Sequence, residues 1–137
     1  MLSIKHKETE FAVGDQIRVT QRIKEGDKER LAAFMGMVIG IKGRMPLVTF
    51  TVRRIGEAGV GIEKIYPVSL PTIEKIEVLK KGGEGVRHSK LYYTRTKSPR
   101  EIDSIYSRTF RKSRVEVAKK TASKSAERSV KKVDTKI

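Results

Sequence analysis

Short runs in which apolar and polar residues alternate, each followed by a turn, constrain the fold of this chain more than any other feature. In residues 15–23 (DQIRVTQRI), Ile17, Val19 and Ile23 fall on one face of an extended chain, and polar side chains fall on the other. By the same pattern, further strands are predicted at residues 30–41, 47–55, 62–68, 73–80 and 86–93. Short strands joined by loops too short for a crossover helix predict a small, mostly antiparallel barrel or sandwich.

Two of these strands carry further expectations. Gly36, inside the second strand, predicts a bulge or a tight bend. The residues of that strand expected to point one way are Leu31, Ala33, Met37, Ile39 and Ile41. Residues 73–80 (IEKIEVLK) also fit helical spacing, but Ile76 and Val78 alternate with charged residues and the neighbouring segments are strands, so we predict a strand there.

The two ends of this β region differ in character. Residues 1–10 are polar and are predicted to be a frayed extension of a barrel at residues 11–97. The last predicted strand places Leu91 and Tyr93 on one face and Tyr92 on the other. We expect one of these tyrosines to lie in the core and the other at an interface.

Beyond residue 97 the pattern becomes helical. Ser98, Pro99 and Glu101 have the spacing of a capping box with proline at the first helical position, which predicts a helix over residues 98–113. Its apolar stripe is Ile102, Ile105, Tyr106 and Phe110, which could pack on the barrel or on a partner. Residues 114–137 form a basic, Lys- and Ser-rich tail that is predicted to be disordered when free.

The charge of the chain indicates its partner. There are 31 Lys+Arg against 16 Asp+Glu, a formal net charge of +15, and nucleic acid is the commonest polyanion to balance such an excess. The chain has no cysteine and only two histidines, so neither a disulfide nor a zinc site is expected. No apolar run is long enough to span a membrane, and we expect a cytoplasmic protein without a membrane partner.

The patterns that could indicate catalysis are weak. GEAGVG and GGEGVR lack the sequence of a phosphate-binding loop and are interpreted as turns. Glu74 and Glu77 flank a lysine on a predicted surface, where nothing would raise the pKa of one carboxyl above that of the other, as a catalytic acid and base pair requires. His88 stands among basic residues and suits phosphate contact better than proton transfer. We therefore predict no enzyme activity, cofactor, metal or small-molecule substrate.

The residues expected to bind RNA are cations at turns and strand ends, together with one tyrosine that could stack on a base or bond to ribose. They are Arg30, Arg44, Arg53, Arg54, Lys80, Lys81, Arg87, His88, Lys90, Tyr92, Arg95, Lys97 and Arg100.

Six segments in order resemble one family. They are FAVGD at 11–15, KEGDKERLAAFMGMVI at 24–39, FTVRRI at 50–55, GVGIEKIYP at 59–67, IEKIEV at 73–78 and VRHSKLYYTR at 86–95. With them the chain resembles the bacterial-type ribosomal protein family numbered nineteen in the large subunit. The resemblance implies an SH3-like barrel that binds large-subunit rRNA near the small subunit and helps form an intersubunit bridge. It also implies RNA contacts at Arg30, Arg53, Arg54, Arg87, Lys90 and Arg95.

The C-terminal segment departs from that family, because TKSPREIDSIYSRTF stands where members have a short basic end. Partners implied for the chain are large-subunit rRNA, small-subunit rRNA and neighbouring ribosomal proteins, in a bacterium rather than an organelle. Two other functions compete: a free regulatory RNA-binding barrel protein, which fits the charge equally, and an enzyme with a basic pocket, for which no catalytic set is found.

Overall fold

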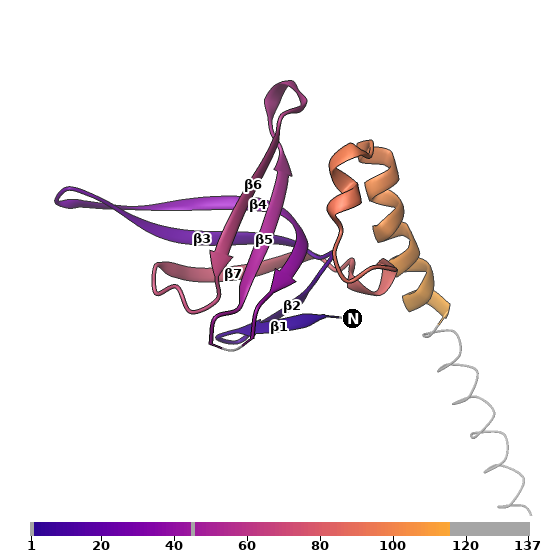
Figure 1. Ribbon diagram of the computed structural model, residues 1–137, viewed down its shortest axis with the longest axis horizontal. Coiled ribbons are helices and arrows are strands. Elements are labelled where there is room, and N and C mark those ends of the chain that lie inside the picture. The colour runs from indigo at the N-terminus through magenta and orange to yellow at the C-terminus, as the bar shows by residue number, and fades with distance from the viewer. Residues whose placement is uncertain (1, 45, 116–137) are drawn as a thin grey trace, which may run out of the picture.

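The computed structural model describes residues 2–44 and 46–115, and most of this part of the chain is β-structure (Figure 1). The main sheet has five strands in the order β6-β5-β4-β3-β7, and every neighbouring pair is antiparallel. These strands are β3 (Gln16–Glu25), β4 (Lys28–Lys42), β5 (Thr49–Ile55), β6 (Gly61–Pro67) and β7 (Ile73–Lys80). A separate two-stranded sheet pairs β1 (Ser3–His6) with β2 (Thr9–Ala12).

The predicted alternation fixes which face of β3 is buried. Ile17 and Val19 are fully buried, while Gln16, Arg18 and Thr20, which alternate with them, are partly exposed. The strand at residues 73–80 is confirmed as β7, which pairs with β3 at the edge of the sheet. The helical alternative for this segment is therefore wrong.

The long strand β4 is exposed at its start, covered on one face in its middle and covered on both faces near its end. Leu31 and Ala33, predicted to point the same way as Met37, Ile39 and Ile41, are exposed, whereas those three residues are buried. The reason is visible in Figure 1, where the end of the β3–β4 hairpin projects as an arm beyond the rest of the sheet. The register shift in β4 lies between Val38 and Gly40 rather than at Gly36.

Gly36 has a different role from the predicted bulge. A Cβ atom at this position would lie 2.4 Å from the backbone oxygen of Arg53, so only glycine lets β4 approach β5 this closely.

The sheet wraps around its core without closing. In the described part of the chain β6 and β7 each pair on one side only, so the mainly-β prediction is confirmed but a closed barrel is not seen. Phe50 lies at the centre of the core, with its ring centroid 5.1 Å from that of Phe11 and 5.5 Å from that of Tyr66. The β1–β2 hairpin supplies Phe11, which completes the core beneath the sheet.

The prediction of a frayed N-terminus is wrong, because residues 3–12 form that hairpin. His6 is buried and its Nδ1 lies 3.0 Å from the carbonyl oxygen of Val68, while Lys7 Nζ donates to the backbone oxygens of Ile73 and Glu74. These long-range bonds, together with the burial of Phe11, hold a segment whose own polarity gave no sign of order.

The prediction of a strand at residues 86–93 is also wrong. Residues 86–91 connect two short 3-10 helices, η2 (Gly83–Gly85) and η3 (Tyr92–Thr96), and the last two residues of the segment begin η3. A third 3-10 helix, η1 (Glu57–Gly59), forms the turn from β5 to β6. The Leu91 N–H donates to the carbonyl oxygen of Ile39 at 2.7 Å, at the register shift of β4. The chain makes this one backbone bond to β4 and then turns into η3.

Residues 99–115 are helical, close to the predicted range, and Glu101 Oε2 accepts a hydrogen bond from the Ser98 N–H at 3.0 Å as the capping box predicts. Ile105 is 1% exposed and packs into the core of the same molecule. Phe110 is 68% exposed, which contradicts its place in the predicted stripe, and Thr109 is buried in its stead. The predicted tail, residues 114–137, lies outside the described residues from position 116 onward.

Candidate nucleic-acid interface

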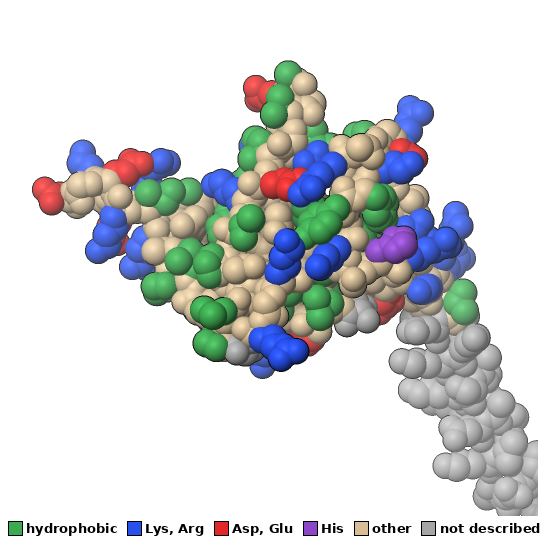
Figure 2. Space-filling model, in the orientation of Figure 1, with side chains coloured by type: hydrophobic (Ala, Val, Ile, Leu, Met, Phe, Trp, Pro, Cys, Tyr) green, Lys and Arg blue, Asp and Glu red, His purple; other side chains and the backbone are tan. Residues whose placement is uncertain are grey.

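Basic side chains are unevenly distributed over the surface. Figure 2 shows Lys and Arg concentrated on the side of the molecule that carries the 3-10 segments and the helix, whereas at the tip of the β3–β4 arm they are interleaved with acids. The arm pairs its charges internally: Arg30 binds Glu25, and Lys24 and Arg22 bind Glu29. The arm is therefore close to neutral, although its sequence is rich in lysine and arginine.

Glu63 organises two of the predicted RNA-binding arginines. Its Oε1 accepts hydrogen bonds from Arg53 Nη1 and Arg95 Nε, both at 2.8 Å, and its Oε2 accepts one from Arg95 Nη2 at 2.8 Å. Glu63 stands directly opposite Arg53 across the β5–β6 pair, which brings the two side chains together. The guanidinium of Arg95, assisted by that of Arg53 against the opposing effect of burial, lowers the pKa of the Glu63 carboxyl. We call these three residues the Glu63 cluster.

Arg53 is the most enclosed member of the Glu63 cluster. Its side chain is 15% exposed, and its guanidinium packs against the backbone of Gly61, where a Cβ atom would lie 2.4 Å from Nη2. Arg54, next along β5, lies on the surface with its guanidinium carbon 5.5 Å from the ring centroid of Phe34. The two arginines therefore leave the strand in different environments, as the strand geometry predicts, and only Arg54 is freely accessible.

The two tyrosines of η3 differ in exposure, because one ring is partly buried and the other lies on the surface. Tyr92 is partly buried against Gly40, with Arg95 and Lys42 over its ring at 4.8 and 5.7 Å from the centroid. Tyr93 is 41% exposed, and its ring lies edge-on to that of His88 with the centroids 5.8 Å apart. Tyr92 is therefore the more enclosed of the two rings, although the strand prediction placed Tyr93 rather than Tyr92 on the face of buried Leu91, because η3 is not extended. That one of the two lies at an interface stays a prediction.

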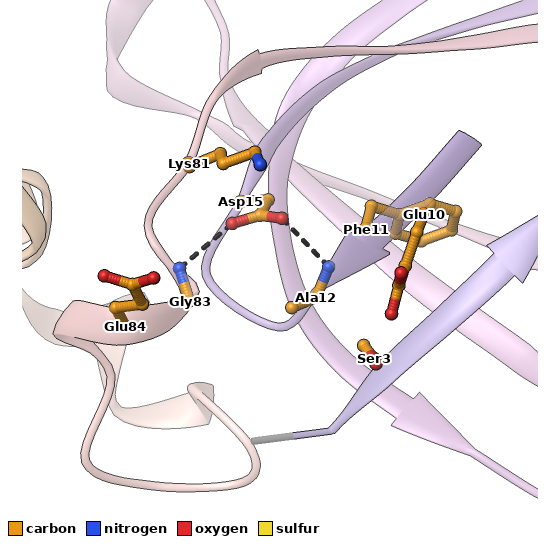
Figure 3. Close-up of a pocket in the computed structure, with 8 residues that line it drawn as sticks. All are labelled: Ser3, Glu10, Phe11, Ala12, Asp15, Lys81, Gly83 and Glu84. Atoms are coloured by element: carbon orange, nitrogen blue, oxygen red, sulfur yellow. Dashed lines mark hydrogen bonds between the residues drawn. The ribbon is translucent and has the colours of Figure 1, made fainter. Parts of the chain in front are cut away.

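The glycine loop between β7 and η2 is held from inside by Asp15. Figure 3 shows its buried carboxylate between Ala12 and Gly83, the N–H groups of which donate to it at 2.9 and 3.0 Å. The Gly82 N–H donates as well, at 2.8 Å. These amides are the donors that a phosphate loop would need, and Asp15 already occupies them. The turn interpretation of GGEGVR is therefore the correct one.

Several of the residues predicted to bind RNA have no acidic partner within the described residues. All of them are exposed: Arg44, Arg54, Lys80, Lys81, Arg87, His88, Lys90 and Arg100. By contrast, Arg30 forms an ion pair with Glu25 and Lys97 forms one with Glu101, so each of these two cations already has a carboxylate partner. A phosphate could therefore bind the eight residues without acidic partners and would not have to displace a carboxylate.

Sequence reasoning missed residues that hold this surface together. Lys42 covers Tyr92 and Lys64 covers Phe34, with the Lys64 ammonium 4.9 Å from the ring centroid. Arg108 Nε and Lys112 Nζ donate to the backbone oxygens of Gly85 and Glu84, at 2.9 and 2.7 Å. None of these contacts follows from local sequence. The contact between Glu63 and Arg53 follows from the register of the β5–β6 pair, which could not be predicted from the sequence of either strand alone.

The catalytic alternatives gain no support from the geometry. Glu74 and Glu77 are exposed or half-exposed and pair with Arg22 and Arg18, and the hydrogen bond from Lys75 lowers the pKa of Glu77. No cluster of three or more potential metal ligands occurs among the residues that the structure describes. None of the described helices is long and apolar enough to cross a bilayer.

Comparison with known proteins places the chain in a family context. Residues 2–106 match the family model described as Ribosomal protein L19. Among curated proteins, the large ribosomal subunit protein bL19 of Thermosipho melanesiensis is 54% identical over 86 residues, which cover 63% of this chain and 73% of that protein. The protein of the same name from Kosmotoga olearia is 51% identical over the same lengths. The match ends within the helix, so the residues after Tyr106 lie outside it.

Proposed function

Because this chain belongs to the ribosomal protein L19 family and is thereby a structural constituent of the large ribosomal subunit in the bacterial cytoplasm, we propose that it binds large-subunit rRNA. The observation that carries this proposal is the group of exposed basic residues without acidic partners in the described part of the chain, of which Lys80, Lys81, Arg87 and Lys90 all lie on the stretch of chain from the end of β7 to the start of η3. Asp15 and Glu63 hold the glycine loop and η3 in place, so the cations project from a rigid base.

We assign the central contacts to Arg87, His88 and Lys90, which stand on the exposed segment between the two 3-10 helices. Arg95 contributes differently: its guanidinium lies over the Tyr92 ring and binds Glu63, which presents a flat, positively charged surface to a nucleotide. Arg53 supports this surface from below and is a positioning residue.

The family membership also supports finer assignments that we propose together. The curled, open sheet corresponds to an SH3-like barrel, and the molecule lies where it meets small-subunit rRNA and helps form an intersubunit bridge. Neighbouring large-subunit proteins are expected partners, and no catalytic step is assigned. The projecting β3–β4 arm is the element that extends farthest from the core and suits contact across such an interface (Figure 1).

Salt dependence tests the RNA-binding surface. Replacing Arg87 and Lys90 together by glutamine should make the slope of log affinity for isolated large-subunit rRNA against log salt less steep by about 1.4 to 1.8, since each phosphate contact contributes about 0.7 to 0.9. A matched loss of charge at Lys5 and Lys28, which lie on β1 and on the arm, should change the slope little. Equal slopes for both double variants would contradict the assignment.

A free regulatory RNA-binding protein is the second candidate, because it would carry the same surface. Co-sedimentation separates the two: a structural constituent should remain with the large subunit at one copy per particle through a high-salt wash. A regulatory protein should instead appear as a free pool. A predominantly free pool would overturn the assignment to rRNA while leaving RNA binding intact.

A further inference from the structure

The C-terminal helix forms one wall of a groove whose other wall is the end of β7 and the glycine loop. Lys80 and Lys81 line it from the loop side, and Tyr106, Phe110 and Arg111 line it from the helix. Glu84 is the one acid in its lining. Three cations against one carboxylate give the groove a positive potential that suits a polyanion.

The helix is fixed to the loop by contacts that leave the groove open. Arg108 Nε and Lys112 Nζ bind backbone oxygens of η2, and Thr109 Oγ1 donates to the Gly82 oxygen at 3.2 Å. These three side chains satisfy the loop carbonyls. Arg111, by contrast, has no acidic partner within residues 2–44 and 46–115.

Tyr106 gives the groove a rigid floor. Its ring packs on the backbone of Gly82, where a Cβ atom would lie 2.9 Å from Cε1, and the Lys80 ammonium lies 5.6 Å from the ring centroid. Burial, with smaller contributions from Asp15 and Asp103, raises the pKa of Tyr106 far above its usual range, as expected for a ring that is packed into the protein.

Phe110 supplies a flat surface at the rim. Its ring is 68% exposed although it belongs to a helix with a well-buried apolar face, so packing among the described residues up to position 115 does not account for it. An exposed aromatic ring beside lysine and arginine is the arrangement that binds single-stranded nucleic acid, with phosphates on the cations and a base stacked on the ring. A duplex cannot use the ring, because its bases are already stacked.

From this arrangement we infer that the groove extends the proposed RNA-binding surface and is specific for a single-stranded stretch: Lys80 and Lys81, which belong to both, bind successive phosphates together with Arg111, and one base stacks on Phe110. The inference rests on the proposed function, since it assumes that the chain works on RNA. It goes beyond the family match, which ends at Tyr106 and so includes neither Phe110 nor Arg111.

The ring is tested at a single position in the full chain, with short single-stranded oligouridine and an RNA duplex of equal length as probes. Phe110→Leu should weaken binding of the single strand about tenfold, and Phe110→Tyr, which keeps a ring, should bind as the unaltered chain does. Binding of the duplex should be unchanged in both variants. Circular dichroism melting of each variant establishes that the helix stays folded.

The cations are tested with Lys81→Gln combined with Arg111→Gln, which should make the salt slope for the single strand less steep by about 1.4. The matched control is Lys5→Gln with Lys28→Gln, which removes the same charge away from the groove. If Phe110→Leu and the groove double variant bind oligouridine as this control does, the groove is not an RNA site, and an acidic protein partner becomes the better occupant. That outcome leaves the proposed function standing, which fails only if the unaltered chain shows no salt-dependent binding to rRNA.

Discussion

Asp15 and Glu63 each hold a basic segment in place, but they do so by opposite means. Asp15 binds only backbone N–H groups, those of Ala12, Gly82 and Gly83, so Lys80 and Lys81 beside it keep their charges free. Glu63 binds the guanidinium groups of Arg53 and Arg95 themselves. One carboxylate therefore positions cations without neutralising them, while the other neutralises part of what it positions.

This difference shows why a count of basic residues does not describe a binding surface. Both regions are rich in lysine and arginine in the sequence, but only the region around the loop presents cations that a phosphate reaches without competition. At the Glu63 cluster a phosphate has to share Arg95 with a carboxylate and gains less from it. Variants of the two acids should consequently differ in how much stability they remove.

The largest effect is expected for Asp15→Asn. In the unaltered chain, backbone N–H groups donate to both Oδ1 and Oδ2 of Asp15, which is only 6% exposed. The asparagine side chain has one acceptor oxygen, and its N–H₂ group would face a backbone N–H, which is also a donor. Losing charge-assisted hydrogen bonds and leaving a buried donor unpaired should lower the free energy of unfolding by about 3 kcal/mol. Urea titration followed by far-ultraviolet circular dichroism measures it. Asp27→Asn, in the exposed turn of the β3–β4 arm, is the control and should stay within about 0.5 kcal/mol of the unaltered chain.

A smaller loss is expected for Glu63→Gln, about 2 kcal/mol by the same measurement. Removing this charge leaves Arg53 without its anion where its side chain is 15% exposed, but Arg95 can turn to solvent and recover hydration. Glu74→Gln breaks the exposed pair with Arg22 and should cost little. Should Glu63→Gln prove as mild as Glu74→Gln, the Glu63 cluster has no supporting role, and Arg53 would have to be regarded as a free RNA contact.

The sequence allowed the sheet to be predicted and left the details of the surface open. Alternation over residues 15–23 and 73–80 is a local signal, and β3 and β7 follow it. The N-terminal hairpin was missed because its strands, SIKH and TEFA, are short and polar and depend on distant bonds such as that from Lys7 to Ile73. Residues 86–93 have the composition of a strand, but the chain makes one backbone bond to β4 at Leu91 and then turns into η3.

The same distinction applies to the candidate site. Residue type correctly identified exposed cations such as Arg87 and Lys90, because charge and turn position are local properties. Whether an arginine is free depends on what faces it across the sheet. Arg53 meets Glu63 only because β5 and β6 pair in one register, and a shift by one residue would place the two on opposite faces. Phe110 was assigned to the buried stripe because helical spacing does not show how far the core extends.

The smallest effect is the pH dependence that the Glu63 cluster should confer. The pKa of Glu63 in the folded protein is lowered below its usual value of 4.5, first by the hydrogen bond from Arg95, so the cluster adds stability that is present above this value. That contribution is lost as the pH falls through the lower folded pKa, because protonation removes the charge that both arginines bind. The free energy of unfolding of the unaltered chain should therefore fall more between pH 6 and pH 3 than that of Glu63→Gln, and the excess should not exceed the difference between them at pH 7. Glu77 and Glu101, whose pKa values are also lowered by their partners, titrate in both proteins and cancel in the comparison. Parallel pH curves for the two proteins would show that Glu63 is not held as an anion by the arginines, and that the cluster positions η3 by packing alone.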